Sequence, residues 1–445
     1  MSQGSTVSTV SEINKMSMEE ASAPAGAKGE EGEQKGLGFA MTAFFLVAQM
    51  AGAGFLSLPN AVANCGWLGL IMMVVFCVGV GFSGTRLGRS WVILEERWPE
   101  QYKGACRQPY MEIAYRALGI HGRRITMLCV AITLVGGTTV FLILLASFMA
   151  ALVTQLSTCQ WVLVCGAVLM PCTWLGTPKD FWQASVLAVV STVLACVVIF
   201  VEVLIEQPKH PNPFYQNPTV SSFALGFGAI LFAFGGASAF PTIQNDMRDR
   251  SQFGKSVVFG FAAILSLYLP VTAAGYAVQG IDVGDNILLT VDTSKGIVKA
   301  AIVMEVINLL GTYIISFNPI GQMFEDMAGI EMKFGWKRCL IRSAILVFEV
   351  VIGLAVPDFG KILNLIGGST ITICSFVLPP LMYAKLVDVK NPNWPKREIE
   401  VWERVLLWMI VAVGVVGGVT TTVVAFKEIL SPNSIGLSCF IDFSL

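Results

Sequence analysis

Long apolar runs separated by short polar stretches make up most of this chain. Counting each run of roughly 20 apolar residues as a membrane-spanning helix predicts about eleven spans. The first five lie near residues 37–60, 67–94, 124–155, 160–176 and 181–205. The others lie near residues 221–246, 254–279, 297–322, 339–356, 360–386 and 401–426. The pattern therefore predicts an all-α integral membrane protein.

Two of these spans contain residues that do not suit an unbroken helix. The first interruption, from Met50 to Asn60, combines two glycines with a serine and a proline. The second, from Phe232 to Pro241, carries two adjacent glycines. Unpaired backbone groups are costly in lipid, so irregular backbone survives there only where it is buried in protein or lines a polar cavity. Two broken spans in corresponding halves of a chain indicate the binding site of a transporter.

The composition agrees with a membrane protein and excludes several other classes. Hydrophobic residues make up 55% of the chain and charged residues 13%, and the mean hydropathy is +0.70, a balance that soluble globular chains do not reach. A net charge of −1 argues against a nucleic-acid partner. We see no metal-ligand spacing and no nucleophile–base pair or phosphate loop for an enzyme. We expect no cofactor, no catalytic residues and two partners, the lipid bilayer and a small molecule.

Basic residues are concentrated in alternate loops, and this sets the expected orientation. Lysines and arginines crowd residues 86–124, 323–342 and 385–404, whereas the other loops have few. By the positive-inside rule these three loops face the cytoplasm. The polar tail at residues 1–35 is predicted to be disordered and cytoplasmic, and a short tail at residues 431–445 to be extracellular or luminal. A plasma membrane and an endolysosomal or vesicular membrane both fit this pattern.

Most of the eleven cysteines lie inside apolar spans, where a cysteine behaves as a small hydrophobic residue. Three of them, Cys65, Cys159 and Cys439, fall near the predicted outer ends of spans. Any two of these could pair, and no spacing selects a pair.

The first break presents both polarities that a zwitterionic amino acid needs. Its glycines let the backbone leave helical geometry, and the helix that restarts there offers free N–H groups that suit a carboxylate. Carbonyls freed before it, near Ala51, suit an ammonium group or a cation. The alternative is that these small residues only form a close helix-packing face. The predicted substrate-binding residues of this break are Gly52, Ala53, Gly54, Phe55 and Ser57.

The second break adds further candidates of the same kind. Its two glycines again free backbone groups, its serine supplies a hydroxyl, and its phenylalanines could form an apolar wall, although such rings also serve as plain core. The predicted substrate-binding residues here are Phe232, Phe234, Gly235, Gly236 and Ser238. The charged run that follows, residues 245–250, is interpreted as a solvated cap or as gate pairing.

Two glutamates, Glu305 and Glu349, lie deepest in the predicted spans, where a charge costs at least about 2.5 to 3.5 kcal/mol. Glu305 shares one helix face with Asn308, Thr312 and Ser316. That face could carry a proton or help to bind a cation, or its carboxyl could be a protonated or hydrogen-bonded structural group. For Glu349, whose span has few polar companions, we expect the structural role.

Several of these stretches resemble the amino acid/auxin permease (AAAP) family. The segment Gly52–Pro59, followed by Gly66 and Trp67, resembles the first-helix signature of that family. The segments Phe232–Gly236 and Pro241–Met247 resemble its sixth helix. Further similarity occurs at Gly284–Leu288, Leu365–Ser369 and Leu378–Pro380. The resemblance covers nearly the whole membrane portion.

The resemblance implies a LeuT-like fold, with two inverted repeats of five helices, discontinuous first and sixth helices, and an eleventh helix. Within a transporter domain at residues 36–430, the repeats would occupy about residues 37–205 and 221–386, and the extra helix about residues 401–426. It also implies that backbone at both breaks holds the substrate. Proton-coupled animal members carry a histidine in the first helix and sodium-coupled members an asparagine, but this chain has Ala48-Gln49-Met50-Ala51. The coupling ion is therefore not implied.

We predict a secondary active amino acid transporter that works by alternating access. A titratable Glu305, with Asn308 and Thr312, favours proton symport. One alternative is a sodium symporter that uses carbonyls near Ala51 together with hydroxyls on the eighth helix, near residues 297–322. Another is an amino-acid-sensing receptor of the same fold with little flux. The small residues around Gly235 would leave room for a large or aromatic substrate side chain.

Overall fold

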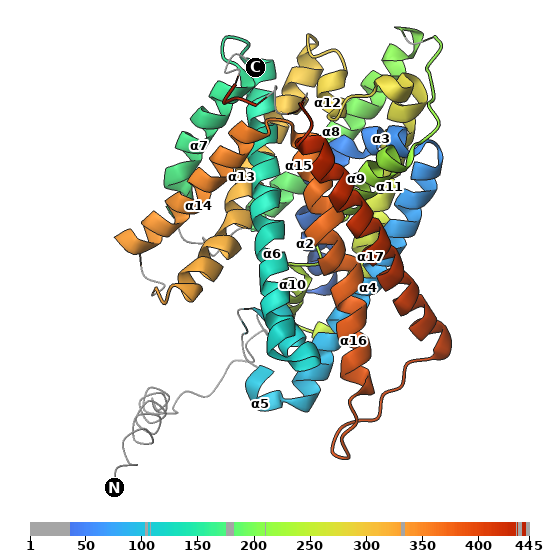
Figure 1. Cartoon of the computed structure of the whole chain (residues 1–445), viewed down its shortest axis with the longest axis vertical. Helices are drawn as coiled ribbons and strands as arrows, with labels where there is room; N and C mark the ends of the chain where they lie inside the picture. The colour runs from blue at the N-terminus through green and yellow to red at the C-terminus, as the bar shows by residue number, and fades with distance from the viewer. Residues whose placement is uncertain are drawn as a thin grey trace, which may run out of the picture. The chain divides into compact units, whose positions relative to one another are not determined.

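Helices that run roughly along one common direction form the described part of the chain (Figure 1). The computed structural model describes residues 36–102, 106, 108–174, 182–209, 211–330, 334–432, 434 and 438–441. Residues Leu37–Leu445 form one unit, and the statements below concern its described part. The expected tail at residues 1–35, the connection at 175–180 and most of the tail at 431–445 lie outside the described residues.

The first half of the chain contains one bent helix pair and four long helices. The elements up to the first proline-rich loop are α2 (Phe39–Met50), α3 (Gly54–Cys65), α4 (Leu68–Arg97), α5 (Pro99–Tyr102), α6 (Pro109–Leu152), α7 (Thr158–Trp174), α8 (Trp182–Glu206) and the 3₁₀ turn η1 (Gln207–Lys209).

The second half begins with another interrupted segment. Its elements are α9 (Val220–Ala233), α10 (Phe240–Asn245), η2 (Arg250–Gln252), α11 (Phe253–Gln279), η3 (Gly280–Asp282), α12 (Ile287–Thr290), α13 (Gly296–Met327), α14 (Trp336–Ala355), α15 (Phe359–Ile366), the π-helical turns η4 (Gly367–Ile371) and η5 (Ile373–Val377), α16 (Leu378–Asp388) and α17 (Val401–Ile429).

Each of the predicted spans corresponds to a helix or helix pair. Among the described residues, seven helices are long and apolar enough to cross a membrane, or eight if the bent pair α2 and α3 counts as one. Of the other predicted spans, α7 has 17 residues, α9 has 14, and α14 has 20 but carries Lys337, Arg338, Arg342 and Glu349.

The third span begins earlier than its hydropathy suggests. The sequence pattern starts it at residue 124, whereas α6 starts at Pro109 and passes a kink at Gly119, where φ is +72°. Proline is well suited to the first turn of a helix, and glycine tolerates the positive φ. The added segment is polar on one side, so a search for apolar runs does not find it.

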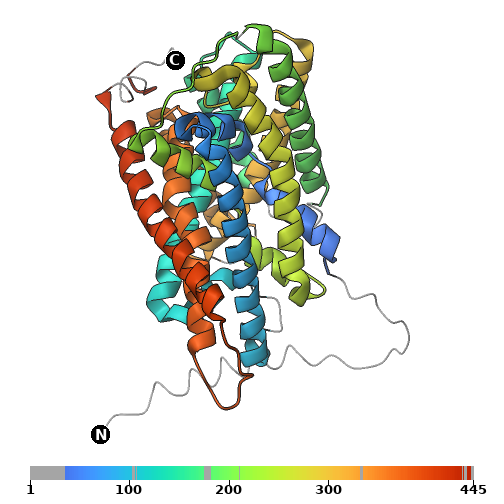
Figure 2. The ribbon, with the colours of Figure 1, turned by 90° about the vertical axis from the view of Figure 1, so that its right-hand side faces the viewer.

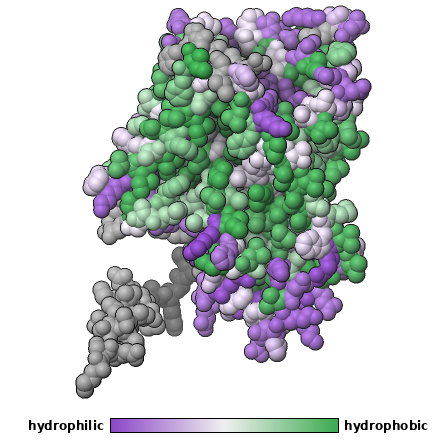
Figure 3. Space-filling model, in the orientation of Figure 1, coloured by the Kyte–Doolittle hydropathy of each residue, from purple (hydrophilic) through white to green (hydrophobic). Residues whose placement is uncertain are grey.

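The two ends of the bundle are distinguished by the loops that they carry. We call the end with α5 and the connection from α16 to α17 the basic end, at the bottom of Figure 1, because arginines such as Arg97 and Arg404 flank these segments. The end that carries residues 207–219 and 280–295 is called the opposite end. Figure 3 shows hydrophobic residues over the middle of the face and hydrophilic residues gathered towards both ends. That distribution is expected of a protein that crosses a bilayer.

Small residues allow the broken helices to pack closely. A Cβ added at Gly54 of α3 would lie 2.5 Å from the Cα of Ala233 in α9. One added at Gly226 of α9 would lie 2.3 Å from the Sγ of Cys65. Close backbone contact through small residues is a common way for helices to associate in membranes. The bent α3 is therefore held directly against α9.

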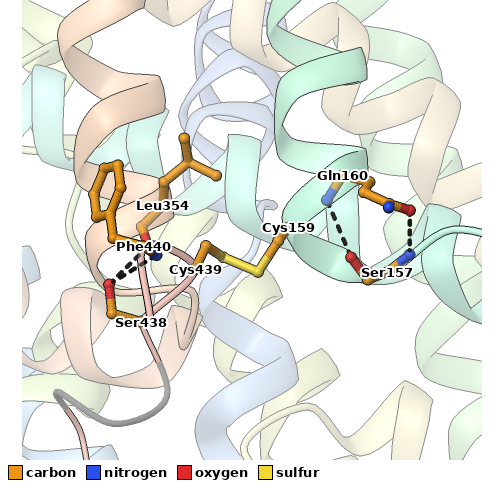
Figure 4. The surroundings of a disulfide bond; sticks show 7 residues. All are labelled: Ser157, Cys159, Gln160, Leu354, Ser438, Cys439 and Phe440. Carbon is orange, nitrogen blue, oxygen red and sulfur yellow. Dashed lines mark hydrogen bonds between the residues drawn. A yellow bond between two sulfur atoms is a disulfide. The ribbon is translucent and has the colours of Figure 1, made fainter. Parts of the chain in front are cut away.

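A disulfide fixes the C-terminal segment at the opposite end. Of the three candidate cysteines, Cys159 and Cys439 are bonded and Cys65 is free. The backbone N–H of Cys439 and the hydroxyl of Ser438 both donate to the carbonyl of Leu354, at 3.0 and 3.3 Å (Figure 4). The segment after α17 thus lies across the start of α7 and the end of α14.

Candidate functional site

The predicted first break is present between α2 and α3. α2 ends at Met50 and α3 starts at Gly54, and the two are bent by 62°. The N–H of Ala51 still donates to Val47, but that of Gly52 donates to the carbonyl of Met50, two residues back, at 2.9 Å. The backbone therefore leaves the helical pattern where the glycines stand.

The second break separates α9 from α10 and lies against the first. The N–H of Gly235 donates to Phe232 at 3.0 Å, and that of Ala239 donates to Gly236 at 3.0 Å, in two successive turns. A Cβ added at Gly236 would lie 3.2 Å from the Cγ of Met50 at the end of α2. The two interruptions, far apart in the sequence, are thus in contact.

Three buried aromatic rings cover the breaks on one side. Phe55 stacks on Tyr268 of α11 with ring centroids 5.7 Å apart, and Phe234 lies 6.2 Å from the same ring. The hydroxyl of Tyr268 donates to the carbonyl of Met50 at 3.0 Å, which also accepts from the N–H of Gly52. The rings exclude solvent, and the hydroxyl gives this carbonyl a second hydrogen bond at the break.

A cavity of about 240 Å³ leads from the basic end to the breaks. Gln49 of α2 and Ser238 of the second break line its deep part, and Gln108 and Asp326 line its outer part. A wider hollow of about 690 Å³ shares Gln108 and Asp326 and adds charged residues of α6. The two together connect the basic end with the middle of the bundle.

Of the ten predicted substrate-binding residues, only Ser238 is among the described residues that line this cavity. The hydroxyl of Ser57 is already bonded to the carbonyl of Gly54 at 3.0 Å. Gly235 is half-buried, and the rest are buried beside or behind the cavity, namely Gly52, Ala53, Gly54, Phe55, Ser57, Phe232, Phe234 and Gly236. Their role in binding stays a prediction.

Sequence reasoning missed several polar residues of the lining. Thr242, Gln322 and Asp326 were not singled out, and Gln49 was noted only as a departure from the related family. Ser316, which helical spacing places on one face with Asn308 and Thr312, also lines the cavity. The same spacing offered a signal for Gln322, since polar residues recur on one side of α13 in an otherwise apolar span.

The predicted polar face of α13 forms a chain of hydrogen bonds. Thr312 donates to the side-chain oxygen of Asn308 at 3.1 Å, and Asn308 donates to the carboxyl of Glu305 at 3.2 Å. The second carboxyl oxygen, Oε1, has no hydrogen-bond partner within the described residues, although Glu305 is buried. Also within those residues, no group of three or more acidic, histidine or cysteine side chains could hold a metal ion.

Helix α8 links this carboxyl to the first break. The hydroxyl of Thr192 approaches the carbonyl of Ala51 at 3.5 Å. The adjacent Ser191 donates to the carbonyl of Met304, the residue before Glu305, at 3.3 Å. Two neighbouring residues of α8 thus contact both the first break and the turn of α13 that carries Glu305.

The interpretation of Glu349 as a hydrogen-bonded structural carboxyl is confirmed. Thr138 of α6 donates to one carboxyl oxygen at 2.6 Å, and the hydroxyl of Tyr313 of α13 is bonded to the other. Glu349 is fully buried. Both oxygens have partners, so this residue joins three helices.

A buried arginine that the sequence did not single out makes a similar junction. Arg342 of α14 pairs with Glu325 at 2.6 Å and donates to the carbonyl of Thr173 at 2.8 Å and to Asn318 at 3.0 Å. Gly321 provides the space for the Arg342 side chain, because a Cβ at this position would lie 3.0 Å from the guanidinium. A buried charge is tolerated where it is paired and hydrogen-bonded.

The charged run at residues 245–250 takes part in pairing between helices. Arg250 forms an ion pair with Glu95 of α4 and donates to the carbonyl of Asn245 at 2.9 Å. The side chain of Asn245 donates to the carbonyl of Cys106 at 3.2 Å. The run therefore combines both interpretations: Arg250 and Asn245 are paired with neighbouring elements, whereas Asp246, Arg248 and Asp249 are exposed.

The opposite end of the bundle is closed above the breaks. Asn60 of α3 donates to the carbonyl of Val283 at 3.0 Å. Gly280, with φ +62°, packs against Phe214, whose carbonyl oxygen would be 2.4 Å from an added Cβ. Trp67 packs on Tyr276 with ring centroids 4.9 Å apart. These contacts cover the end of α3.

An acidic group lies in the closed loop, outside the spans. Burial raises the pKa of Asp285 to about 6, with further repulsion from Asp358 and Glu428 and an opposing effect of Lys361. The carboxyl packs against the start of α15, where a Cβ at Gly360 would lie 2.8 Å from its Cγ.

Two solved structures share the fold of this chain. One solved structure is the manganese transporter of Eremococcus coleocola with an aromatic bis-isothiourea compound, 14% identical, covering 94% of this chain and 93% of that one with a TM-score of 0.55. Another is MhsT in complex with L-phenylalanine, 11% identical, covering 89% and 100% with a TM-score of 0.57. At these identities the likeness shows the fold, which is LeuT-like.

Relatives found by sequence similarity identify the family of this chain. Amino acid transporter AVT1H of Arabidopsis thaliana is 26% identical, over 77% of this chain and 80% of that protein. Lysine histidine transporter-like 6 of the same plant is 26% identical, over 88% and 90%. The model of the family described as transmembrane amino acid transporter protein matches residues 35–426. The chain therefore belongs to the transmembrane amino acid transporter family.

Proposed function

We propose that this protein moves an amino acid across the membrane by alternating access, and that the two touching breaks form the substrate site. The observation that carries the proposal is the cavity that runs from the basic end to Gln49 and Ser238. The opposite end is closed by the contacts of Asn60, Trp67 and Gly280. A site that is open to one side only is what alternating access requires.

The chemistry of the breaks suits a zwitterion. α3 starts at Gly54, and the first N–H groups of a helix lack partners within the helix and attract a carboxylate. The turns at the second break leave carbonyls that attract an ammonium group. The names of the relatives that resemble this chain, which include lysine and histidine for one of them, support an amino acid as the substrate class.

Proton coupling through Glu305 is the favoured mechanism. This carboxyl is buried with one unpartnered oxygen, and α8 connects its turn to the first break. A sodium ion near Ala51 would compete with hydroxyls that already approach the carbonyls of Met50 and Ala51, at 3.0 and 3.5 Å. Sodium would have to share these carbonyls with the hydroxyls, whereas proton symport through Glu305 leaves both contacts as they are.

The basic end is proposed to face the cytoplasm. The positive-inside rule supports this, since arginines and lysines gather there. The disulfide between Cys159 and Cys439 at the opposite end supports it independently (Figure 4). Disulfides persist in oxidising compartments and are rare in the cytosol. The cavity would then be open to the cytoplasm, and the C-terminus extracellular or luminal.

Purified protein in proteoliposomes tests the proposal. A panel of labelled amino acids is offered with an inward pH gradient, an inward sodium gradient, or neither. We expect accumulation with acid outside and without sodium. We expect Glu305→Gln to lose accumulation but to keep exchange of labelled for unlabelled substrate, because a neutral group at that position no longer releases a proton.

Three results would contradict parts of the proposal. Accumulation that requires sodium would refute the role of Glu305 as proton carrier. Binding of an amino acid without flux under either gradient would favour the receptor alternative. Equal accumulation by wild type and Glu305→Gln in a pH gradient would place the coupling group elsewhere.

A further inference from the structure

A second pocket lies at the basic end, between α4, η2 and α11, away from the substrate cavity. Its volume is about 480 Å³. Helices α4 and α11 run next to each other on the face shown in Figure 2. The charged residues among its described lining are all cationic, namely Arg86, Arg89, Arg250 and Lys255.

Two of these cations are already neutralised. Arg86 pairs with Glu403 of α17 at 2.6 Å, and Arg250 pairs with Glu95. Their carboxylates do not line the pocket. The positive charge that remains for a ligand must therefore come from the other two.

Arg89 and Lys255 are both exposed, and neither has an ion pair within the described residues. The pKa of the exposed Asp249 lies below its usual value mainly because of hydrogen bonds from Ser251 and Gln252, with a smaller effect of Lys255. Lys255 is thus near an acidic group without being paired to it. Two free cations, one on each wall, face a common space.

The same pocket also offers an unused acceptor and an apolar rim. Gln244 is fully buried and lines the pocket, and its Oε1 has no hydrogen-bond partner within the described residues, whereas its Nε2 donates to the carbonyls of Gly88 and Arg250. Val258 and Phe259 of α11 line it too and are 61% and 63% exposed. In a membrane protein such exposed apolar residues face lipid tails.

We propose that this pocket binds the headgroup of an anionic phospholipid that carries hydroxyls. Arg89 and Lys255 would hold its phosphate, the Oε1 of Gln244 would accept from a headgroup hydroxyl, and an acyl chain would lie along Val258 and Phe259. Basic pockets between helices at the cytoplasmic side of membrane proteins bind such headgroups. A soluble phosphate would make no use of the apolar rim.

Occupancy would bear on the transport cycle. Gln244 belongs to α10, the half-helix that follows the second break, and its bond to Gly88 ties α10 to α4. A lipid seated beside this bond would stabilise the conformation in which α10 lies against α4. This consequence rests on the proposed transport, whereas binding of the lipid itself does not.

Native mass spectrometry of the full-length purified protein tests the binding. Phosphatidylglycerol is the probe, with phosphatidylcholine as neutral lipid and glycerol phosphate as soluble headgroup. The test variant is Arg89→Gln with Lys255→Gln. The matched control is Arg124→Gln with Lys385→Gln, which removes the same charge from exposed residues at the basic end that do not line the pocket.

Each cation near a membrane surface strengthens anionic lipid binding by roughly 5-fold, so the test variant should bind phosphatidylglycerol about 25-fold more weakly. The control variant and the wild type should bind alike, and glycerol phosphate should compete only weakly. Equal losses in both variants would overturn the proposal, since they would show unspecific attraction. Binding of phosphatidylcholine as strong as that of phosphatidylglycerol would also overturn it, and full competition by glycerol phosphate would point to a soluble ligand instead.

Discussion

Replacing Gly54 with alanine should destabilise the protein, because no room exists for a side chain there. The added Cβ would lie 2.5 Å from the Cα of Ala233 and 3.1 Å from its Cβ and N. Two of these three atoms belong to the backbone, so α3 or α9 itself has to move. Overpacking of this kind typically costs about 1 to 3 kcal/mol.

A matched glycine without neighbours separates this contact from the general effect of alanine. Gly137 lies within α6 and has nothing within 4 Å of an added Cβ. There alanine should stabilise by about 0.5 to 1 kcal/mol, because it loses less conformational freedom on folding. The two variants should therefore shift stability in opposite directions.

Thermal unfolding in detergent, followed by the loss of the monodisperse peak in size-exclusion chromatography, measures both variants. We expect Gly54→Ala to melt below the wild type and Gly137→Ala at or above it. A larger residue, Gly54→Val, should lower the melting temperature further. If Gly54→Ala melts at or above the wild type, the contact between the two broken helices is not as close as described.

Two further predictions concern groups outside that contact. Thr138→Val should lower stability by about 1 to 3 kcal/mol, because it leaves a carboxyl oxygen of the buried Glu349 without the bond at 2.6 Å; an unchanged melting temperature would show that this bond adds nothing. The pKa of Asp285 is about 6 in the folded protein against 3.8 for the free group, so the folded state binds more protons than the unfolded state between these pH values. The stability that this carboxyl contributes is therefore full below about pH 4 and is lost as the pH rises through about 6. Melting temperatures at pH 5 and pH 7 should therefore differ less for Asp285→Asn than for the wild type, and an equal difference would refute the assignment.

The elements that carry strong local patterns could be predicted from the sequence. Glycines and a proline inside apolar runs revealed both breaks, because these residues act on their own backbone. Helical spacing placed Glu305, Asn308 and Thr312 on one face, and the structure joins them by hydrogen bonds. The family resemblance supplied the expectation that the two breaks meet.

Contacts between distant residues could not be predicted in this way. The junction at Arg342 of α14 uses Thr173 of α7 and Asn318 and Glu325 of α13, and no local pattern relates these residues. The choice of Cys159 and Cys439 among three candidate cysteines also depends on how α7 and the C-terminal segment are placed.

The residues that line the cavity could not be predicted from local patterns either. Sequence reasoning favoured the glycines and phenylalanines of the breaks, because these residues free backbone or offer apolar surface. Most of them turn out to be packed in the interior, and polar side chains such as Gln49 and Asp326 line the open space instead. Packing against neighbouring helices decides which side of a broken helix faces a cavity. Local sequence patterns do not reveal that side.

The most direct test of the substrate site fills the deep part of the cavity. Ser238→Phe places a large ring where the cavity reaches the second break, and Ser266→Phe places the same ring on the exposed side of α11 as a control. Uptake of the labelled amino acid into proteoliposomes is measured for both, with melting temperatures to check folding. We predict that Ser238→Phe folds but takes up no substrate, while Ser266→Phe transports like the wild type. Normal uptake by a folded Ser238→Phe would show that the substrate does not pass between the two breaks.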